Sequence, residues 1–421
     1  MLFGAAKETI TPYKRMNMQG FAAYFGNDLR AVHDDIYVRA LVMEDDDSNR
    51  MLILSFDLLF HEYQLASCLA GFAYESLGIP AGSVLINYTH NHCGPALKRY
   101  NQWEFSEEYE AYIEEAAKRC MMRAVMGMTP GTALYAETEG DWNISRRLMK
   151  DGECLFRPNP EGKRNKKLNI IKFIAVDGHV KAMLFNYACH PSSLKSDYAV
   201  SGEYPGRLCQ LADTYFYGNT SVFIQGFSAD IKSRYTVSGD GESFMSVGFD
   251  IIDTMASEMW GTVKEAVYKK IDLKLTGRHF KTKLDLNIYP KAYYIEQRKL
   301  LLEGKSFFLA ACAEHVIENY EKLGASLDLN SAMMRLSDKL YIFALGGEPP
   351  CGLETVLQKA FPDLKLIFAG YMDDIAYIPS DSMIREGGYE AEGSVIEYRL
   401  KGSIVPGVDA RIVEAFRENF I

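Results

Sequence analysis

A strand–helix–strand pattern recurs three times along the chain and limits the possible folds more than any other feature of the sequence. In the first copy, residues 50–57 form an apolar run typical of a buried strand. Residues 61–78 carry apolar side chains near helical spacing, and residues 83–90 form a second apolar run. Strand, helix and strand of these lengths predict a βαβ unit, in which a right-handed crossover makes the two strands parallel.

The later copies keep this order and lie at 179–190, 203–218 and 221–230, and at 339–350, 352–361 and 364–374. A predicted hairpin precedes each of the first two copies. Residues 37–44 meet 50–57 across DDDSN, and 169–176 meet 179–186 across an Asp-Gly pair, which favours a two-residue turn. Hairpins that feed βαβ units give mixed sheets. The two assemblies predict an α/β fold with two mixed β-sheets packed together and helices on the outside, in αββα-like layers.

Two stretches interrupt the repeated pattern. Residues 151–169 are polar and contain Pro and Gly, which predicts a long surface loop. Residues 287–324 predict a helical excursion between the second and third copies. Because no shift in composition demands a boundary, we expect a single domain over residues 1–421.

Composition argues against several classes of protein. The net charge of −10 disfavours nucleic acid as a partner. No apolar stretch approaches the roughly 20 residues of a membrane span, and residues 1–12 lack the features of a secretory signal. The eight cysteines are scattered without a CxxC pair, which predicts reduced thiols and a cytoplasmic location. Nothing in the sequence indicates the oligomeric state.

Polar side chains collect where the predicted parallel strands end, and ligands bind at this edge of open α/β sheets. The first copy ends with His90 and His92, the second reaches His190, and the third reaches Glu348. On an extended backbone side chains alternate faces, so we expect His90 and His92 to project to the same side. Two or three imidazoles with one carboxylate are typical of a zinc site that keeps a position open for water.

The alternative is that the HxH pair is only polar sequence at the end of a strand. The pair is weak evidence by itself, and the HxHxDH pattern of metallo-β-lactamases is absent, because Gly94 and Pro95 stand where its Asp and last His would be. The Glu348 carboxylate could ligate a metal or take a proton from a bound water. Two glycines before Glu348 allow close backbone approach, and two prolines after it stiffen the exit.

The chain resembles the neutral/alkaline, non-lysosomal ceramidases from about Phe3 to about Glu390, in motifs that occur in the same order. These motifs are GAAKETITP, VHDDIYVRALV, SFDLLF, THNHCGP, NYACHPSSL, SGEYPG, IQGFSADIKSRY, ALGGEPP and GYMDDIAYIPSDSMIREGGYE. The resemblance implies a ceramidase-like catalytic domain without the C-terminal immunoglobulin-like domain of the family. It also implies one zinc ion per chain, held by His90, His190, Glu348 and Tyr377.

The resemblance further implies that His92 and Tyr389 face the substrate carbonyl, with Arg146 or Arg147 beside them. Zinc lowers the pKa of a bound water from 15.7 to roughly 7. Tyr or Arg donors stabilise an oxyanion by about 3 kcal/mol each, and Glu348 or His92 could pass a proton to the leaving amine. Tyrosine is an unusual zinc ligand, so the alternative for Tyr377 is a core aromatic residue.

Lys232 departs from the family pattern, because many ceramidases carry a serine at the matching place in the SADIKSRY segment. Lysine is a point cation and a poor substitute for serine. We include Lys232 with His92, Tyr389 and Arg146 as candidate catalytic residues. Its ammonium could select an anionic substrate group, or it could form a structural ion pair with Asp230.

The leading hypothesis is a zinc-dependent hydrolase that resembles neutral ceramidase and cleaves an amide (N-acyl) bond with metal-activated water. Its substrate would be a small-molecule or lipid-like N-acyl compound. This compound need not be ceramide and could be smaller and more soluble than ceramide. Two other readings stay open. One is a non-catalytic metal- or ligand-binding relative, and the other is a metal-dependent esterase or phosphoesterase of a soluble metabolite.

Overall fold

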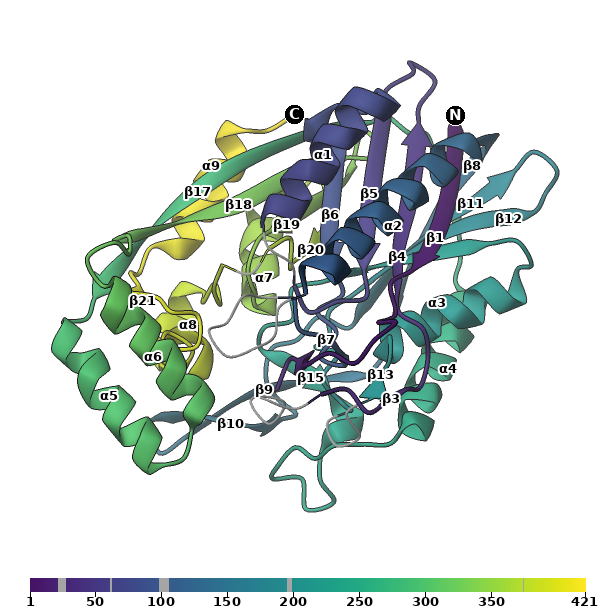
Figure 1. Ribbon diagram of the computed structural model, residues 1–421. Coiled ribbons are helices and arrows are strands. Elements are labelled where there is room, and N and C mark those ends of the chain that lie inside the picture. The colour runs from purple at the N-terminus through teal and green to yellow at the C-terminus, as the bar shows by residue number, and fades with distance from the viewer. Residues whose placement is uncertain (22–27, 61–62, 98–105, 195–198, 374) are drawn as a thin grey trace.

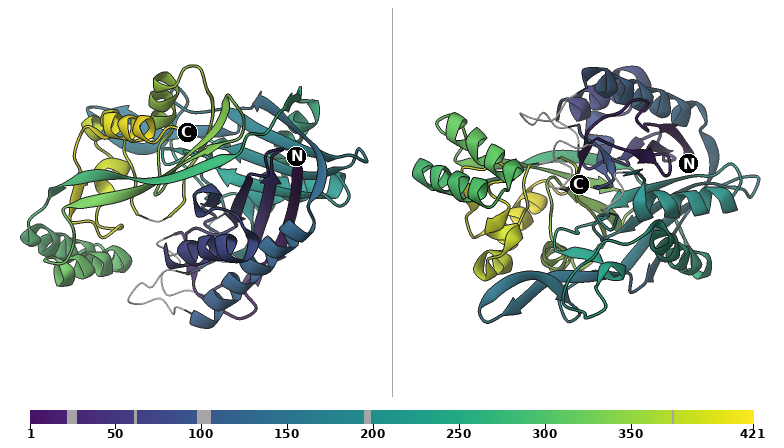
Figure 2. Two further views of the ribbon diagram at one scale, coloured as in Figure 1. Left: turned by 90° about the horizontal axis from the view of Figure 1, so that it is seen from above. Right: turned by 60° about the horizontal axis from the view of Figure 1, so that its bottom comes forward.

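Two β-sheets pack face to face, with helices on their outer faces (Figures 1 and 2). The computed structural model describes residues 1–21, 28–60, 63–97, 106–194, 199–373 and 375–421. The interior between the sheets is an apolar cluster with side chains from both sheets. One sheet contributes Ile53, Ile171 and Val222, and the other contributes Ile342 and Ile367. This arrangement confirms the predicted α/β fold with two mixed sheets and outer helices.

The larger sheet has the strand order β14-β12-β11-β8-β1-β4-β5-β6, with β16 paired to β8. Its strands are β1 (Leu2–Thr9), β4 (Tyr37–Glu44), β5 (Arg50–Phe56), β6 (Val84–Tyr88), β8 (Thr129–Glu139), β11 (Lys167–Ala175), β12 (Val180–Tyr187), β14 (Thr220–Gln225) and β16 (Lys269–Ile271). The β4–β5 and β11–β12 pairs are antiparallel, whereas β5–β6 and β12–β14 are parallel. Both predicted hairpins and both parallel crossovers are therefore confirmed.

The smaller sheet has the order β20-β19-β18-β17-β21 and contains the third copy, because β19 and β20 are parallel. Its strands are β17 (Thr276–Ile288), β18 (Ser326–Arg335), β19 (Leu340–Leu345), β20 (Lys365–Ala369) and β21 (Gly402–Ile404). The two hairpin-plus-βαβ assemblies do not form one sheet each. Strands β1 and β8 pair with each other and join both assemblies edge to edge in the larger sheet.

Helices cover the outer face of each sheet (Figures 1 and 2). On the larger sheet lie α1 (Tyr63–Leu77), α2 (Glu107–Met126), α3 (Glu203–Tyr215) and α4 (Phe249–Glu265). On the smaller sheet lie α7 (Cys351–Ala360) and α9 (Val408–Glu418). The crossover helices α1, α3 and α7 confirm the three predicted helices, although residues 61 and 62 of the first prediction lie outside the described ranges.

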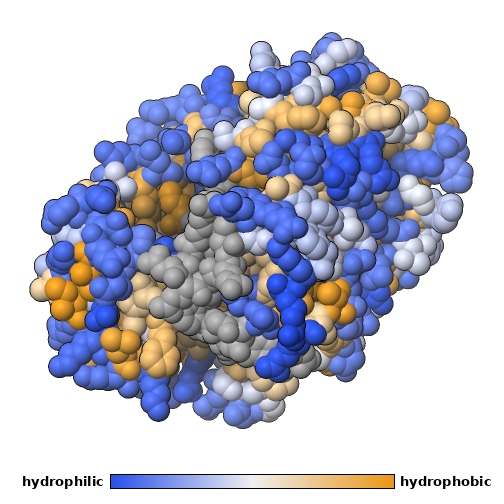
Figure 3. Space-filling model, in the orientation of Figure 1, coloured by the Kyte–Doolittle hydropathy of each residue, from blue (hydrophilic) through white to orange (hydrophobic). Residues whose placement is uncertain are grey.

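The predicted helical excursion is a pair of helices, α5 (Lys291–Glu303) and α6 (Phe307–Asn319), which projects from the body beside the short helix α8 (Asp381–Glu386). Figure 3 shows a largely hydrophilic face with separate apolar patches, one of them over this pair, where Ile295 and Leu300 are exposed. In the ranges given above, every helix is too short or too polar to cross a lipid bilayer.

The prediction of a long surface loop over 151–169 is wrong for 151–159, and only residues 160–166 form a loop. Strands β9 (Asn143–Lys150) and β10 (Glu153–Asn159) form an antiparallel hairpin there, and β15 (Ile231–Ser233) pairs with the other edge of β9. Asp151 and Gly152 turn the chain with φ of 52° and 84°. This is the same Asp-Gly turn that was recognised at 177–178, but the polar strands around it obscured the signal.

Short elements complete the described chain. Two-residue strands pair as β2 (Met18–Gln19) with β7 (Gly94–Pro95) and as β3 (Ala31–Val32) with β13 (Ala199–Val200). There are also 3₁₀ turns at Ala81–Ser83 and Arg234–Thr236 and a π-helical turn at Tyr389–Gly393.

Candidate metal centre

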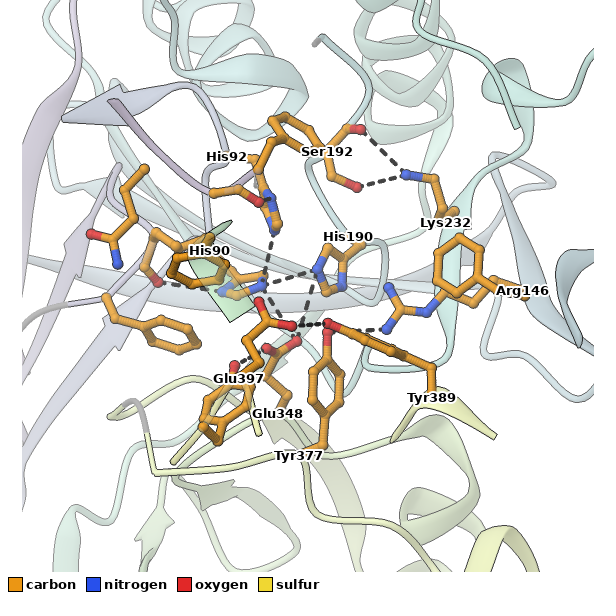
Figure 4. Close-up of a pocket in the computed structure, with 18 residues that line it drawn as sticks. His90, His92, Arg146, His190, Ser192, Lys232, Glu348, Tyr377, Tyr389 and Glu397 are labelled. Atoms are coloured by element: carbon orange, nitrogen blue, oxygen red, sulfur yellow. Dashed lines mark hydrogen bonds and ion pairs between the residues drawn. The ribbon is translucent and has the colours of Figure 1, made fainter. Parts of the chain in front are cut away.

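Three histidines, two from the HxH pair and one 100 residues further along the chain, point the same ring nitrogen toward one another (Figure 4). The Nε2 atom of His90 lies 3.0 Å from Nε2 of His190 and 3.2 Å from Nε2 of His92. The possible ligand atoms of the three residues all lie within 4.8 Å of one another. His90 and His190 are buried, whereas His92 is partly exposed. This cluster can hold a metal ion.

A backbone carbonyl orients each of these imidazoles from its other nitrogen, Nδ1. For His90, His92 and His190 the carbonyls belong to Leu59, Gly20 and Ser228, at 3.4, 2.6 and 3.2 Å. Because a carbonyl oxygen only accepts hydrogen bonds, the proton of each ring belongs on Nδ1, and Nε2 presents a lone pair. Three lone pairs that face one another repel, and a cation between them removes that repulsion.

The surroundings keep two of the rings neutral. Burial lowers the pKa of His190 well below its usual value, and the neighbouring His90 and Arg146 lower it further. Burial also lowers the pKa of His92, with His90 and Lys232 as the next causes. Metals bind the neutral form of imidazole, so the protonation states favoured here are the ones that metal binding requires.

Glu348 brings a carboxylate to the same point. Its Oε2 atom lies 3.4 Å from Nε2 of His90 and 3.8 Å from Nε2 of His190. Oε1 accepts a hydrogen bond from Tyr398, but Oε2 is buried and has no hydrogen-bond partner among the described residues. Burial raises the pKa of Glu348 to about 7, although the hydrogen bond from Tyr398 and the charge of Arg146 both act to lower this pKa. A cation beside the imidazoles would satisfy the unpaired oxygen, so this residue set fits a divalent metal.

Gly347 explains how the backbone presents Glu348. Its φ is +63°, and a Cβ at this position would collide with the carbonyl oxygen of Ala376. This close approach lets Glu348 form an isolated parallel bridge with Tyr377, in which the amide of Glu348 donates to Ala376 O at 2.8 Å. The sequence-based expectation that glycine permits close backbone approach is confirmed.

We expect Gly347→Ala to weaken metal binding by the centre about 10- to 100-fold, because strain at positive φ and the collision would displace the Glu348 carboxylate. Competition with a chelator measures this change. The matched control is Gly261→Ala in α4, where an added Cβ meets nothing within 4 Å. That change should raise the unfolding free energy by roughly 0.5–1 kcal/mol and leave metal affinity unaltered. Unchanged metal affinity in Gly347→Ala would contradict the geometry argued above.

The expected extended backbone at the HxH pair is wrong, although the two rings do meet. Strand β6 ends at Tyr88, and His90 has a φ of 61°, in the left-handed region. Alternation along a strand therefore cannot align His90 with His92. The turn at His90 does so instead, with the amide of His92 bonded to the carbonyl of Pro191 at 3.2 Å.

Arg146, rather than Arg147, lines the pocket next to the histidines. Its Nη2 donates to the Tyr377 hydroxyl at 3.0 Å, and its Nε donates to Glu390 at 2.9 Å. Neighbouring residues of strand β9 point to opposite sides, so Arg147 instead binds Glu390 from the other side, at 2.5 Å, together with Glu386. Figure 4 shows the Tyr377 hydroxyl directed at the centre, which distinguishes it from a residue that only fills the core.

Comparison with known proteins bears on the fold. No protein-family profile and no curated protein sequence matches the chain. The solved structure of neutral ceramidase from Pseudomonas aeruginosa is similar over 99% of this chain and 73% of that one, with a TM-score of 0.77 and 16% sequence identity. A structure described as ceramidase complexed with C2 has a TM-score of 0.76 and 16% identity, over 99% of this chain and 74% of the other.

The chain has the neutral ceramidase fold. The similarity extends over nearly all of its length, and it confirms at the level of fold the resemblance that the motifs indicated. At 16% identity the comparison establishes the fold alone, so the chemistry has to be argued from the site.

The ceramidase fold brings the remaining predicted residues to the same pocket, which has a volume of about 270 Å³. The Tyr389 hydroxyl donates to Glu397 at 2.5 Å. Lys232 donates to the carbonyl and hydroxyl oxygens of Ser192, at 3.3 and 2.9 Å. The sequence also suggested Asp230 as an ion-pair partner of Lys232. The Asp230 carboxylate accepts a hydrogen bond from the amide of Cys351 at the start of α7, at 2.9 Å.

Sequence reasoning missed Ser192, Glu390, Glu397 and Tyr398. Glu390 was visible as the last residue of the GGYE motif, but nothing marked it as the partner of two arginines. Glu397 and Tyr398 follow the last recognised motif, and a carboxylate and a tyrosine in a polar stretch carry no signal. Only folding of 389–398 over the pocket gives these two residues a role.

Proposed function

We propose that this chain is a metal-dependent hydrolase that cleaves an amide (N-acyl) bond, with one zinc ion held by His90, His190, Glu348 and Tyr377. The observation that carries the proposal is the convergence of imidazole lone pairs on a buried, unpaired carboxylate oxygen at the edge of a pocket. Imidazoles with one carboxylate are typical ligands of catalytic zinc, which keeps a coordination position open. Amide hydrolysis is the reaction that the ceramidase resemblance implies.

When bound, zinc lowers the pKa of a water to about 7 and polarises a carbonyl oxygen. The chain's own residues supply the other steps. Arg146 holds the Tyr377 hydroxyl and places a buried positive charge beside the position where negative charge would develop. His92 is the most accessible of the three imidazoles and is not one of the four proposed ligands, so its Nε2 lone pair would be left to take up a proton and return it to the leaving amine.

Tyr389 acts in this proposal as an oxyanion donor: its one hydroxyl proton, donated to Glu397 in this structure, would turn to the substrate oxygen when a substrate binds. We expect Tyr389→Phe to lower kcat by about 10²- to 10³-fold, the usual cost of losing one such donor. Its zinc content should not change, because Tyr389 is not a proposed ligand. Steady-state kinetics together with metal analysis measure both. Tyr74→Phe, an exposed tyrosine on α1, is the matched control. A loss of zinc with the loss of activity would argue against a donor role.

A metal assay and a substrate panel test the proposal. The purified chain should bind one zinc per chain and hydrolyse small N-acyl amides. Zinc without turnover on amides, carboxylate esters and phosphate esters would indicate the non-catalytic relative. Turnover of phosphate esters but not amides would indicate the phosphoesterase. With the cytoplasmic location predicted from the cysteines, the substrate in this proposal is a soluble N-acyl compound.

A further inference from the structure

Lys232 lies in the pocket wall directly beside a proposed metal ligand. It forms an isolated parallel bridge with His190, and neighbouring β segments lie only about 5 Å apart. The side chain is nearly buried, at 9% exposure, and its ammonium donates to both oxygens of Ser192. The ammonium also lies 5.6 Å from the centre of the Phe244 ring. A positive charge is therefore held in a defined place within reach of the imidazoles.

The pocket is small and has two different polar walls. Its volume of about 270 Å³ lies at the lower end of the range for small-molecule sites. In Figure 4, Lys232 and Ser192 form one wall, Tyr377 and Glu348 lie opposite, and the imidazoles stand between them. If the reacting carbonyl of a ligand lies at the imidazoles, the part of the ligand a few bonds away from that carbonyl therefore lies near the Lys232 ammonium.

The charge of Lys232 acts on this space. Lys232, His92 and His190 line the same pocket, and Lys232 is bridged to His190 through the backbone. The field of the Lys232 charge therefore reaches the position of the reacting group. In a buried pocket an ammonium attracts an anionic group more strongly than it would in water.

We propose that Lys232 selects N-acyl substrates that carry a carboxylate a few bonds from the scissile amide. The inference rests on the proposed function and names its substrate class. The ammonium would form charge-assisted hydrogen bonds to the carboxylate, and the Ser192 hydroxyl, which accepts from Lys232, keeps a proton to donate. The ion pair with Asp230 that the sequence also suggested is the less favoured reading, because Asp230 directs its carboxylate to Cys351.

Matched substrates test the selection. One pair is N-acetylglycine and its methyl ester, with the carboxylate on the amine side. The other is N-methylsuccinamic acid and its methyl ester, with the carboxylate on the acyl side. In each pair, amide cleavage is followed. For at least one pair, kcat/KM of the acid should exceed that of the ester about 10- to 100-fold. Lys232→Met should abolish that ratio mainly through KM, and Ser192→Ala should reduce it about 3- to 10-fold.

Lys232→Arg and Lys264→Met provide the controls. Lys232→Arg keeps the charge and should retain part of the preference, which guards against misfolding of the neutral variant. Lys264→Met removes an exposed lysine on α4 and should leave the preference unchanged. Equal kcat/KM for acid and ester in both pairs, or an unchanged ratio in Lys232→Met, would overturn the inference.

Binding to the metal-free protein separates this inference from the hydrolase proposal. Calorimetric titration should show that N-acetylglycine or N-methylsuccinamic acid binds about 10-fold or more tightly than its ester, and that Lys232→Met removes the difference. If no amide is hydrolysed but this binding preference is found, the hydrolase proposal fails and the carboxylate site stands. If amides are hydrolysed without any preference in binding or turnover, the hydrolase proposal stands and the carboxylate site fails.

Discussion

His190→Ala is expected to remove the bound metal and to lower kcat/KM for an amide substrate by at least about 10³-fold. The imidazole of His190 lies between His90 Nε2, at 3.0 Å, and Glu348 Oε2, at 3.8 Å, so its loss opens the centre on the buried side. Metal ions contribute several kcal/mol to such reactions, and each 1.36 kcal/mol corresponds to tenfold in rate. Elemental analysis of the purified variant, with kinetics before and after added zinc, measures both effects.

His179→Ala is the matched control, because it removes an exposed imidazole in the turn after β11. It should keep one metal per chain and full activity. A His190→Ala variant that still holds one metal and turns over normally would remove the basis of the proposed function. A variant that loses the metal while the wild type shows no hydrolysis would support a metal-binding relative instead.

Glu390→Gln is expected to lower the free energy of unfolding by about 3–5 kcal/mol. Glu390 is buried between the guanidinium groups of Arg146 and Arg147, with Nε of Arg146 at 2.9 Å and Nη1 of Arg147 at 2.5 Å. Removal of its charge leaves two cations close together away from water. The midpoint of urea unfolding measures the loss. Activity should also fall, because Arg146 would no longer be held against Tyr377.

Glu386→Gln controls for the general effect of removing an acid near Arg147. Glu386 also contacts Arg147, at 3.2 Å, but its side chain is 41% exposed. Exposed pairs contribute about 1 kcal/mol or less, so this variant should unfold close to the wild-type midpoint. Equal destabilisation by the two substitutions would show that the buried arrangement around Glu390 contributes little.

Much of the secondary structure could be predicted because its signals are local. The alternation and apolar runs in residues 37–56 and 169–187 identify hairpin strands, and helical spacing identifies α1 and α3. The hairpin at Asp151-Gly152 was missed because β9 buries polar residues such as Asn143 and Arg146, which removes the periodic apolar pattern. The assignment of strands to sheets also could not be predicted, since the β1–β8 pairing that joins two assemblies is a contact between distant segments.

The residues of the site likewise fall into those that could be predicted from the sequence and those that could not. His90, His92, His190 and Glu348 could be proposed because each follows a recognisable strand. Tyr398 could not, because its role depends on the last part of the chain returning to Glu348. The left-handed backbone at His90 was equally invisible, since only a few per cent of non-glycine residues take that conformation and the neighbours around His90 come from other segments.

The sequence by itself determined the three strand–helix–strand units with their parallel crossovers, the two hairpins that precede the first two units and the types of side chain available for metal chemistry. These follow from residue spacing and backbone preferences within about a dozen positions. Only the tertiary structure decided that two imidazoles 100 residues apart share a point in space, that Arg146 rather than Arg147 faces it, and that Lys232 stands beside it. The physical reason is that such contacts arise when sheets and loops bury their apolar faces together, and that burial sums over the whole chain.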